Sequence, residues 1–209
     1  MLKRSLIVAL AVVGWTGAAN AMPTNAGFEA GLTGWTVGGD AANASAIGSL
    51  GPIGPGEGSL MGFISTAPGD VTTTSLSQSF AALAAPFTFF VDFLTDEDTP
   101  DSTFNDTFTV ANQAGTLLTL DTFSAFGPAP GTGFFQHTGS HVVVLPVGST
   151  SVTFTVFDVD DTIIDSAALI DNAPFPAVDA FGVPEPGTLA LFGAGLLGLG
   201  LVRRRRRTA

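Results

Sequence analysis

Two histidines are the side chains of this chain best suited to acid–base catalysis or metal binding. His137 and His141 are its only imidazoles, and with a serine and an aspartate either could form an acyl-transfer site. The sequence has no Gly-x-Ser-x-Gly element to present such a serine. The i, i+4 spacing would hold a metal ion on a helix, but Gly139-Ser140 between the histidines indicates a turn or a strand. We interpret both as exposed polar residues and predict no catalytic residue.

Two acidic clusters could supply paired carboxylates for glycoside hydrolysis or oxygen ligands for calcium. The first consists of Asp96, Glu97, Asp98, Asp101 and Asp106, and the second of Asp158, Asp160, Asp161 and Asp165. Neither fits an EF-hand, because the twelfth position counted from Asp158 is Leu169 and the sixth is not glycine. Solvated acidic loops explain most such runs. Calcium at one of the clusters stays a hypothesis, since no amine competes for these oxygens.

The distribution of charge excludes several classes of partner. The seven Lys and Arg residues are residues 3, 4 and 203–207, whereas residues 22–182 contain 17 of the 18 acids and no Lys or Arg. Binding of nucleic acid or of anionic lipid requires a basic surface, so neither is predicted for this part of the chain. The chain has no cysteine, which rules out disulfides and thiol chemistry.

Both ends of the chain have the composition of targeting segments. Residues 1–21 combine a short basic start, an apolar stretch and a small-x-small cleavage site at Ala19-Asn20-Ala21, which predicts a secretory signal peptide. Near the other end, Pro184 and Pro186 set a helix boundary before the apolar residues 188–202. This segment is short for a membrane span, and the arginines after it favour the cytoplasmic side. A permanent tail anchor is an alternative, and a buried core helix is a weaker one.

The tail also resembles a known sorting signal. Pro184-Glu185-Pro186, the apolar run and Arg203–Arg207 occur in the order of the PEP-CTERM signal of Gram-negative bacteria that produce exopolysaccharide. The resemblance implies an exosortase-type transpeptidase as partner and transient contact of residues 188–202 with the inner membrane. It implies that Pro184, Glu185, Pro186 and the residues Arg203, Arg204, Arg205, Arg206 and Arg207 carry the signal. The predicted organisation is a signal peptide (1–21), one domain (22–178), a linker (179–182) and the sorting signal with a short hydrophobic helix (183–209).

The central domain has the pattern of an all-β protein. Alternation is clearest in Phe87–Phe93, Ser75–Phe80 and Val152–Val159, where the inward side chains of the last segment are Val152, Phe154 and Val156. Further strands are predicted at Ser59–Ser65, Asp106–Ala111, Leu117–Phe123, His141–Val147 and Ala167–Ile170. A helical period is conceivable only at Ala81–Ala85. Closely spaced strands joined by Gly/Pro turns predict an antiparallel β-sandwich.

Motifs at the two ends of the domain resemble those of galactose-binding-like jelly rolls, a fold found in carbohydrate-binding modules. Residues 25–29 read Asn-Ala-Gly-Phe-Glu, residues 31–35 read Gly-Leu-Thr-Gly-Trp, and residues 165–172 read Asp-Ser-Ala-Ala-Leu-Ile-Asp-Asn. The resemblance implies that the first and last strands lie side by side. It also implies a structural calcium ion held by Glu29 and Asp171, with backbone carbonyls near Gly27.

The aromatic residues that usually stack on sugars are scarce. The chain has no tyrosine, and Trp35 is the only tryptophan outside the predicted signal peptide. We predict that Trp35 is a core residue. Where related sequences are expected to have Thr-Gly-Trp, this chain has Thr132-Gly133-Phe134-Phe135, and we predict core packing for both phenylalanines. Ligand-binding residues are therefore not assigned.

These observations predict an exported, non-catalytic protein of the cell envelope or of the extracellular matrix. The sorting enzyme would process a membrane-tethered precursor, and the product would associate with exopolysaccharide in a biofilm. A secreted carbohydrate-binding module is the alternative, and a secreted hydrolase is a weaker one.

Overall fold

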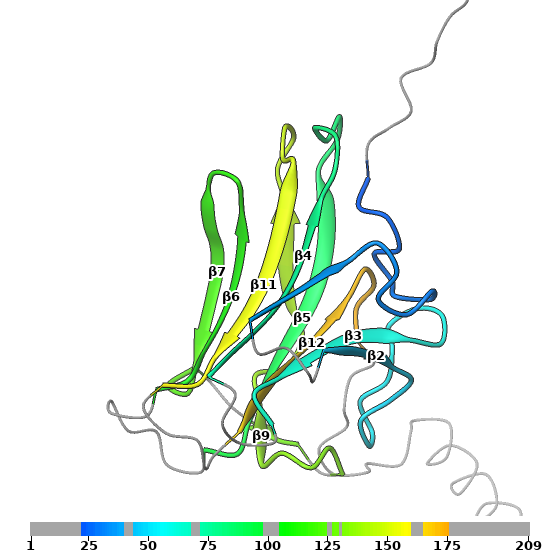
Figure 1. Ribbon diagram of the computed structural model, residues 1–209. Coiled ribbons are helices and arrows are strands. Elements are labelled where there is room, and N and C mark those ends of the chain that lie inside the picture. The colour runs from blue at the N-terminus through cyan, green and yellow to red at the C-terminus, as the bar shows by residue number, and fades with distance from the viewer. Residues whose placement is uncertain are drawn as a thin grey trace, which may run out of the picture.

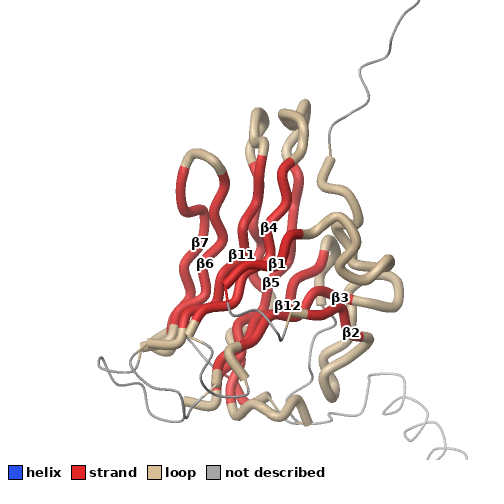
Figure 2. The backbone as a smooth tube through the Cα atoms, in the orientation of Figure 1, coloured by secondary structure: helices blue, strands red, loops and turns tan. Residues whose placement is uncertain are grey.

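The structure, a computed structural model, describes residues 22–39, 44–67, 72–97, 105–124, 127–129, 131–159 and 165–175. These residues form two antiparallel sheets and no helix (Figures 1 and 2). The strands are β1 (Thr36–Gly39), β2 (Ser45–Ile47), β3 (Met61–Ser65), β4 (Thr73–Ser79), β5 (Phe87–Thr95), β6 (Thr107–Asn112), β7 (Gly115–Asp121), β8 (Gly127–Pro128), β9 (Gln136–His137), β10 (His141–Leu145), β11 (Ser151–Phe157) and β12 (Ser166–Asp171).

The five-stranded sheet has the order β1-β4-β11-β6-β7. Along β11, Val152, Phe154 and Val156 are fully buried, while the serine and threonines between them lie on the other face. This alternation fixes the register, because a slip of one residue would turn the apolar set towards solvent.

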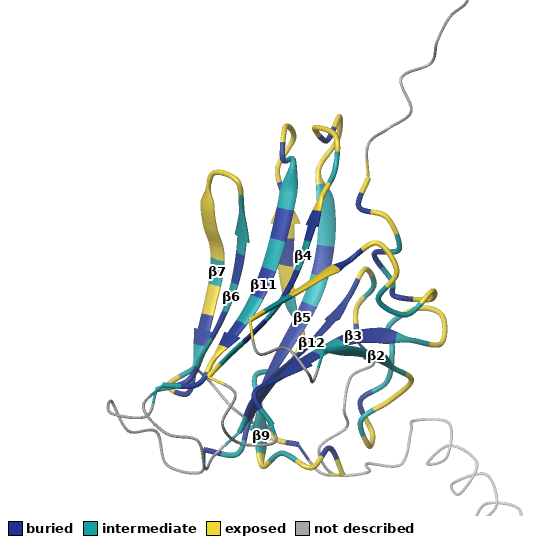
Figure 3. Cartoon of the chain, in the orientation of Figure 1, coloured by how far each residue is buried: buried dark blue, intermediate teal, exposed yellow. Residues whose placement is uncertain are grey.

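The seven-stranded sheet has the order β2-β3-β12-β5-β9-β8, and β10 pairs with β5 beside β9. Of its two central strands, β12 is buried throughout and β5 is buried from Val91 to Thr95, with half-buried residues nearer its start (Figure 3). Because β12 has neighbours on both sides and apolar contacts on both faces, all six of its residues are removed from water.

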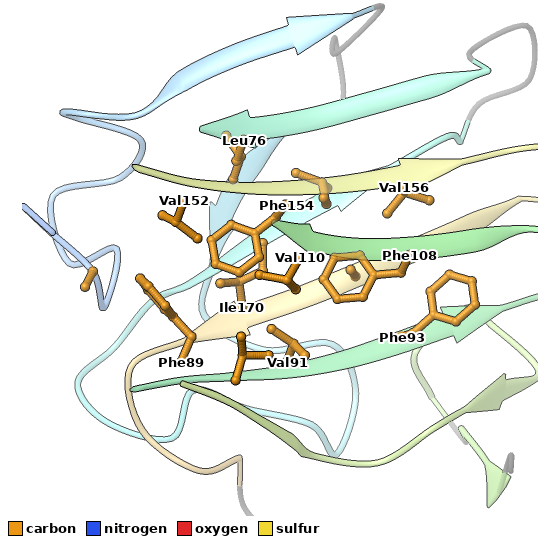
Figure 4. Close-up of a cluster of buried hydrophobic side chains, with 14 of the residues drawn as sticks. Leu76, Phe89, Val91, Phe93, Phe108, Val110, Val152, Phe154, Val156 and Ile170 are labelled. Carbon is orange, nitrogen blue, oxygen red and sulfur yellow. The ribbon is translucent and has the colours of Figure 1, made fainter. Parts of the chain in front are cut away.

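The main hydrophobic core fills the space between the sheets. Side chains from β4, β5, β6, β11 and β12 point towards one another there (Figure 4). A second cluster lies on the opposite face of β3, β5 and β12 and includes Ile53, Met61, Leu94, Leu169 and Phe175. The seven-stranded sheet is therefore apolar on both faces at β3, β5 and β12, where loop residues such as Ile53 and Phe175 pack on its outer face.

The predicted sandwich is confirmed, and each of the eight predicted strands overlaps an observed one. Four short strands, β1, β2, β8 and β9, were not predicted, because segments of two to four residues are too short to show alternation. The conceivable helical period at Ala81–Ala85 is wrong, since these residues connect β4 to β5 without regular structure.

The targeting segments lie outside the described residues. This holds for the signal peptide at 1–21, the end of the predicted domain, the linker at 179–182 and the tail at 183–209. Their boundaries stay predictions. Within the described ranges, no helix is long and apolar enough to cross a membrane.

Candidate functional site

The opening motif is a structural turn. The Asn25 side chain accepts a hydrogen bond from the Ala30 N–H (2.9 Å) and donates to the carbonyls of Gly31 (2.9 Å) and Thr33 (3.1 Å). Asn25 and Phe28 both have positive φ angles, 52° and 59°, a conformation that asparagine tolerates well. The turn places the Phe28 ring in the core, directly over Gly62 of β3. A Cβ atom added to Gly62 would lie 2.6 Å from this ring, so only glycine fits there.

Trp35 lies at the end of this turn and is buried, with 8% of its surface exposed. Its ring stacks on Phe28 at a centroid distance of 5.0 Å and also contacts Phe89 and Phe154. The indole Nε1 donates to the Asn25 carbonyl (3.1 Å), which satisfies its one polar atom. The prediction that Trp35 is a core residue is confirmed.

Glu29 and Asp171 both hold the loop that precedes β3. Glu29 Oε1 accepts the N–H groups of Ser59 (2.7 Å) and Leu60 (2.9 Å). Asp171 Oδ2 accepts the N–H of Gly56 (2.8 Å), and its Oδ1 accepts that of Asn172 (2.6 Å). Burial raises the pKa of Asp171, and these N–H donors partly oppose the rise. The two predicted calcium ligands thus act on one loop.

A pocket of about 280 Å³ lies beside this loop, and its oxygen donors are of the type that calcium prefers. Its described lining consists of Asn25, Gly27, Glu29, Glu57, Gly58 and Asn172. Glu29 is in this lining and Asp171 is not, because the Asp171 oxygens face the N–H groups of the loop. Within the described ranges, no three His, Asp or Glu side chains form a metal-binding group. We propose that Glu29 can contribute to a calcium site, and its pairing with Asp171 as ligands stays a prediction.

Calcium should stabilise the domain beyond its effect on ionic strength. The test is thermal unfolding in chelator, in calcium chloride, and in sodium chloride of equal ionic strength. A ligand that binds only the folded state at 100 times its Kd adds about 2.7 kcal/mol, and this gain should shrink in Glu29→Gln and in Asp171→Asn. Equal stabilisation by the sodium salt, or an undiminished calcium response in both variants, would contradict a calcium site at Glu29 and Asp171.

The first and last strands do not lie side by side, contrary to the implication of the resemblance. β1 pairs with β4 in the five-stranded sheet, and β12 lies in the other sheet. The opening segment still meets the end of β12, because a Cβ atom on Gly27 would lie 2.7 Å from Asn172 Oδ1. The contact is made by the turn before β1, whose residues belong to no strand.

His137 is not the exposed residue that the sequence suggested. Its Nδ1 lies 2.8 Å from Asp92 Oδ2, and the two side chains are 13% and 3% exposed. The Thr138 hydroxyl donates to Asp92 Oδ1 (3.2 Å) and accepts the Phe93 N–H (3.0 Å). Asp92 was overlooked, although its place in the alternating β5 sequence puts it on the face opposite to Phe93. The pair gives a buried carboxylate a hydrogen-bond partner in a domain without Lys or Arg.

Stability should fall as the pH rises through neutrality. The hydrogen bond to Asp92 raises the pKa of His137 above its usual 6.5, although burial opposes the rise. The folded state therefore holds this proton more tightly than the unfolded state. Its contribution is complete below pH 6.5 and is lost as the pH passes the folded pKa. Burial raises the pKa values of Asp171 and Asp96 as well. These two groups therefore also make the domain less stable as the pH rises above 3.8.

The measurement is the melting temperature of the wild type and of His137→Gln from about pH 5 to about pH 8. The wild type should lose stability above pH 6.5 more steeply than the variant. Parallel curves would show that His137 binds its proton equally in both states.

The two acidic clusters meet at one end of the sandwich. The Asp96 N–H donates to the Asp165 carbonyl (3.1 Å), and the nearby charge of Asp165 adds to the rise in the pKa of Asp96. Asp106 accepts the Ser166 hydroxyl (2.7 Å) and the Val159 N–H (2.9 Å). These contacts tie β12 to the segments that flank β6 and β11. Asp98, Asp101, Asp160 and Asp161 lie outside the described residues, and calcium at either cluster stays a prediction.

A hydrogen-bonded loop positions Phe134 beside the outer face of the seven-stranded sheet. The Thr132 hydroxyl donates to the Ala129 carbonyl (2.7 Å) and accepts the Phe134 N–H (3.1 Å). Gly131 and Gly133 have φ angles of 76° and 90°, which only glycine adopts without strain. The backbone of Gly131 also lies directly against Gly51, so a Cβ atom on Gly51 would overlap it. This contact joins the loop to the segment before β3.

A shallow pocket of about 480 Å³ lies between this loop and β3. Its described lining is uncharged and consists of Ala44, Ser45, Leu50, Phe63, Ser65, Ala67, Thr132 and Phe134. Phe134 also packs against the second cluster, which agrees with the predicted core packing. The same prediction is wrong for Phe135, which is 67% exposed, because the bend at residues 132–135 turns this ring away from the second cluster. The sequence did not single out Phe63 or Ser45.

The predicted sorting residues Pro184, Glu185, Pro186 and Arg203–Arg207 have no described geometry, but comparison with known families covers them. Residues 182–207 match the PEP-CTERM protein-sorting motif. The chain carries a PEP-CTERM sorting signal. This signal indicates export by an exosortase-type processing enzyme, with a membrane-anchored precursor in a Gram-negative bacterium.

Solved structures with a similar course of the chain include proteins of several kinds. TmCBM61, solved with β-1,4-galactotriose, is 16% identical with a TM-score of 0.40, and the match covers 77% of this chain and 100% of that one. An adhesin domain of Lys-gingipain from Porphyromonas gingivalis is 16% identical with a TM-score of 0.41, covering 69% and 95%. A cyclase from Fischerella sp. TAU is 13% identical with a TM-score of 0.43, covering 76% and 97%. No curated protein sequence matches this chain. At this level of similarity, the ligands and activities of these proteins cannot be assigned to the PEP-CTERM protein.

Proposed function

We propose that the exported domain is a non-catalytic component of the extracellular polysaccharide matrix. In this proposal it binds neutral saccharide units in the pocket between Phe63 and Phe134. The observation that carries the proposal is the chemistry of this pocket, where two phenylalanine and two serine side chains form part of an uncharged depression on the outer face of the sheet. Aromatic rings pack against the apolar faces of sugar rings, and hydroxyl groups hydrogen-bond to their edges.

The charge of the domain supports a neutral ligand. Residues 22–182 contain no Lys or Arg, so a uronate or sulfate group would find no cationic partner and would be repelled by the acids. Neutral hexoses avoid this repulsion. The acids outside the pocket then keep the domain soluble within a hydrated matrix.

The pocket lining supports binding without catalysis. Two of its hydroxyls are already engaged inside the protein, since Ser65 donates to the Ser166 carbonyl (3.2 Å) and Thr132 to the Ala129 carbonyl (2.7 Å). No carboxylate or imidazole belongs to its described lining. A general acid and a nucleophile, which glycoside hydrolysis requires, are therefore missing from that lining.

Affinity electrophoresis in gels containing neutral or anionic polysaccharides tests the proposal. The chain should be retarded by at least one neutral polymer and not by alginate. Phe134→Leu keeps most of the packing volume but removes the flat ring, and it should weaken binding by about two- to tenfold. Phe135→Leu is the matched control, because this neighbouring ring is exposed and outside the pocket lining. Equal retardation of both variants, or retardation by alginate alone, would contradict the proposal.

A further inference from the structure

The strand β10 is an edge strand with an apolar outer face. It pairs only with β5 among the described strands, from His141 opposite Val91 to Leu145 opposite Phe87. Val143 and Leu145 point inward and are buried. Val142 and Val144 point outward and are 60% and 49% exposed. Together with Val147, which is 60% exposed, they make up three of the nine exposed large apolar side chains of the described residues.

The other edge strands have features that discourage pairing with another chain. β2 and β8 have three and two residues, and β1 has four, of which two are glycines. The pairing of β7 with β6 contains a register shift between Val110 and Ala111. Short strands and bulges limit edge-to-edge association. β10 has neither feature, because its pairing with β5 runs over five residues without a shift and contains no Pro, Asp, Glu, Lys or Arg.

We propose that β10 is a self-association surface at which a second copy of this chain adds its own β10 in antiparallel orientation. An antiparallel pair centred on Val143 places Val142 opposite Val144 of the second copy. The two outward valines then cover each other on the same face. The backbone groups along the outer edge of each β10, which pair with no other described strand, hydrogen-bond between the two copies. The seven-stranded sheets of the two copies would become continuous.

The charge distribution favours this strip as the place where two copies of the acidic domain can meet. The domain is acidic and contains no Lys or Arg, so two copies repel each other over most surfaces. The segment from His141 to Val147 has no acid, and neither does its partner segment Phe87–Val91 on β5. Two copies can therefore approach along this strip with the least repulsion. A partner that binds through basic groups would instead be drawn to acidic surfaces. This proposal does not depend on saccharide binding, although a dimer would present two pockets.

Sedimentation of the full chain in a mild detergent, over a range of sodium chloride concentrations, tests the proposal. A dimer is expected whose dissociation constant falls as salt screens the repulsion between copies. The double variant Val142→Glu/Val144→Glu should raise that constant by about tenfold or more, because it places like charges in contact. Its melting temperature should stay close to that of the wild type, since both side chains are exposed. Leu117→Glu, on the bulged β7, is the control and should dimerise normally.

Crosslinking supplies a second readout in this cysteine-free sequence. Val142→Cys should be joined into dimers by a short bismaleimide, and Leu117→Cys should not. A monomeric wild type at all salt concentrations would overturn the proposal. So would a dimer that the double glutamate variant leaves intact, which would place the association elsewhere, for example in the apolar tail.

Discussion

Replacing Trp35 by alanine should lower the free energy of unfolding by about 3–5 kcal/mol, the usual loss for a large aromatic side chain in a core. Trp35 is 8% exposed and contacts the rings of Phe28, Phe89 and Phe154. The substitution would leave a cavity at the point where the opening turn meets both sheets. Because domains are stable by only about 5–15 kcal/mol in total, the variant should unfold at a much lower temperature or denaturant concentration.

Phe135→Ala is the matched control, since this ring is 67% exposed and its loss should change stability by less than about 0.5 kcal/mol. Trp35 emission should also be blue-shifted in the wild type and unaffected by polysaccharide. Emission at long wavelength that a glycan quenches would show that the indole is an exposed binding platform.

Replacing Glu185 by alanine should stop processing and leave the chain in the membrane as a precursor. The PEP-CTERM motif spans residues 182–207, and Glu185 is its acidic residue between two prolines. A sorting enzyme that reads this sequence should lose the contact that the carboxylate provides, whereas apolar insertion of residues 188–202 should be unchanged. Immunoblots of membrane and extracellular fractions give the readout.

Mass spectrometry of the wild-type exported protein is the companion measurement. Peptides from Leu189–Ala209 should be missing from it and present in the Glu185→Ala precursor. Thr188→Ser serves as the control substitution, because it lies just beyond Pro-Glu-Pro-Gly and should be processed normally. An intact Arg203–Arg207 tail on the exported wild type would favour a permanent anchor over enzymatic sorting.

The longer strands could be predicted from the sequence because their side chains alternate strictly. In β11, one face is Val152, Phe154 and Val156, and no other secondary structure buries that set together. Trp35 could be placed in the core because tryptophan side chains are highly buried on average. The short strands β8 and β9 depend on backbone pairing with distant residues, such as His137 opposite Leu94, which no local pattern contains.

The features that could not be predicted from the sequence involve residues far apart in the chain. Asp92 and His137 are separated by 45 positions and pair because β9 lies beside β5. Phe63 in β3 and Phe134 line one pocket. They meet because the backbone contact between Gly51 and Gly131 joins the segment before β3 to the loop that contains Phe134. Phe134 and Phe135 are chemically identical neighbours, and only the turn made by Gly131 and Gly133 determines which ring packs inward. The sequence shows that these residues are present, but it does not show which of them come into contact in the folded chain.

The most direct test of the account is the amount of processed protein that stays with the extracellular polysaccharide of living cells. The fraction should be measured for the wild type, Phe134→Leu and Phe135→Leu, with total export quantified in parallel. The account predicts that all three are exported and processed equally, that the wild type and Phe135→Leu are retained to the same extent, and that a larger fraction of Phe134→Leu is found free in the medium. Equal retention of Phe134→Leu, or a wild type found only in the free medium, would contradict it.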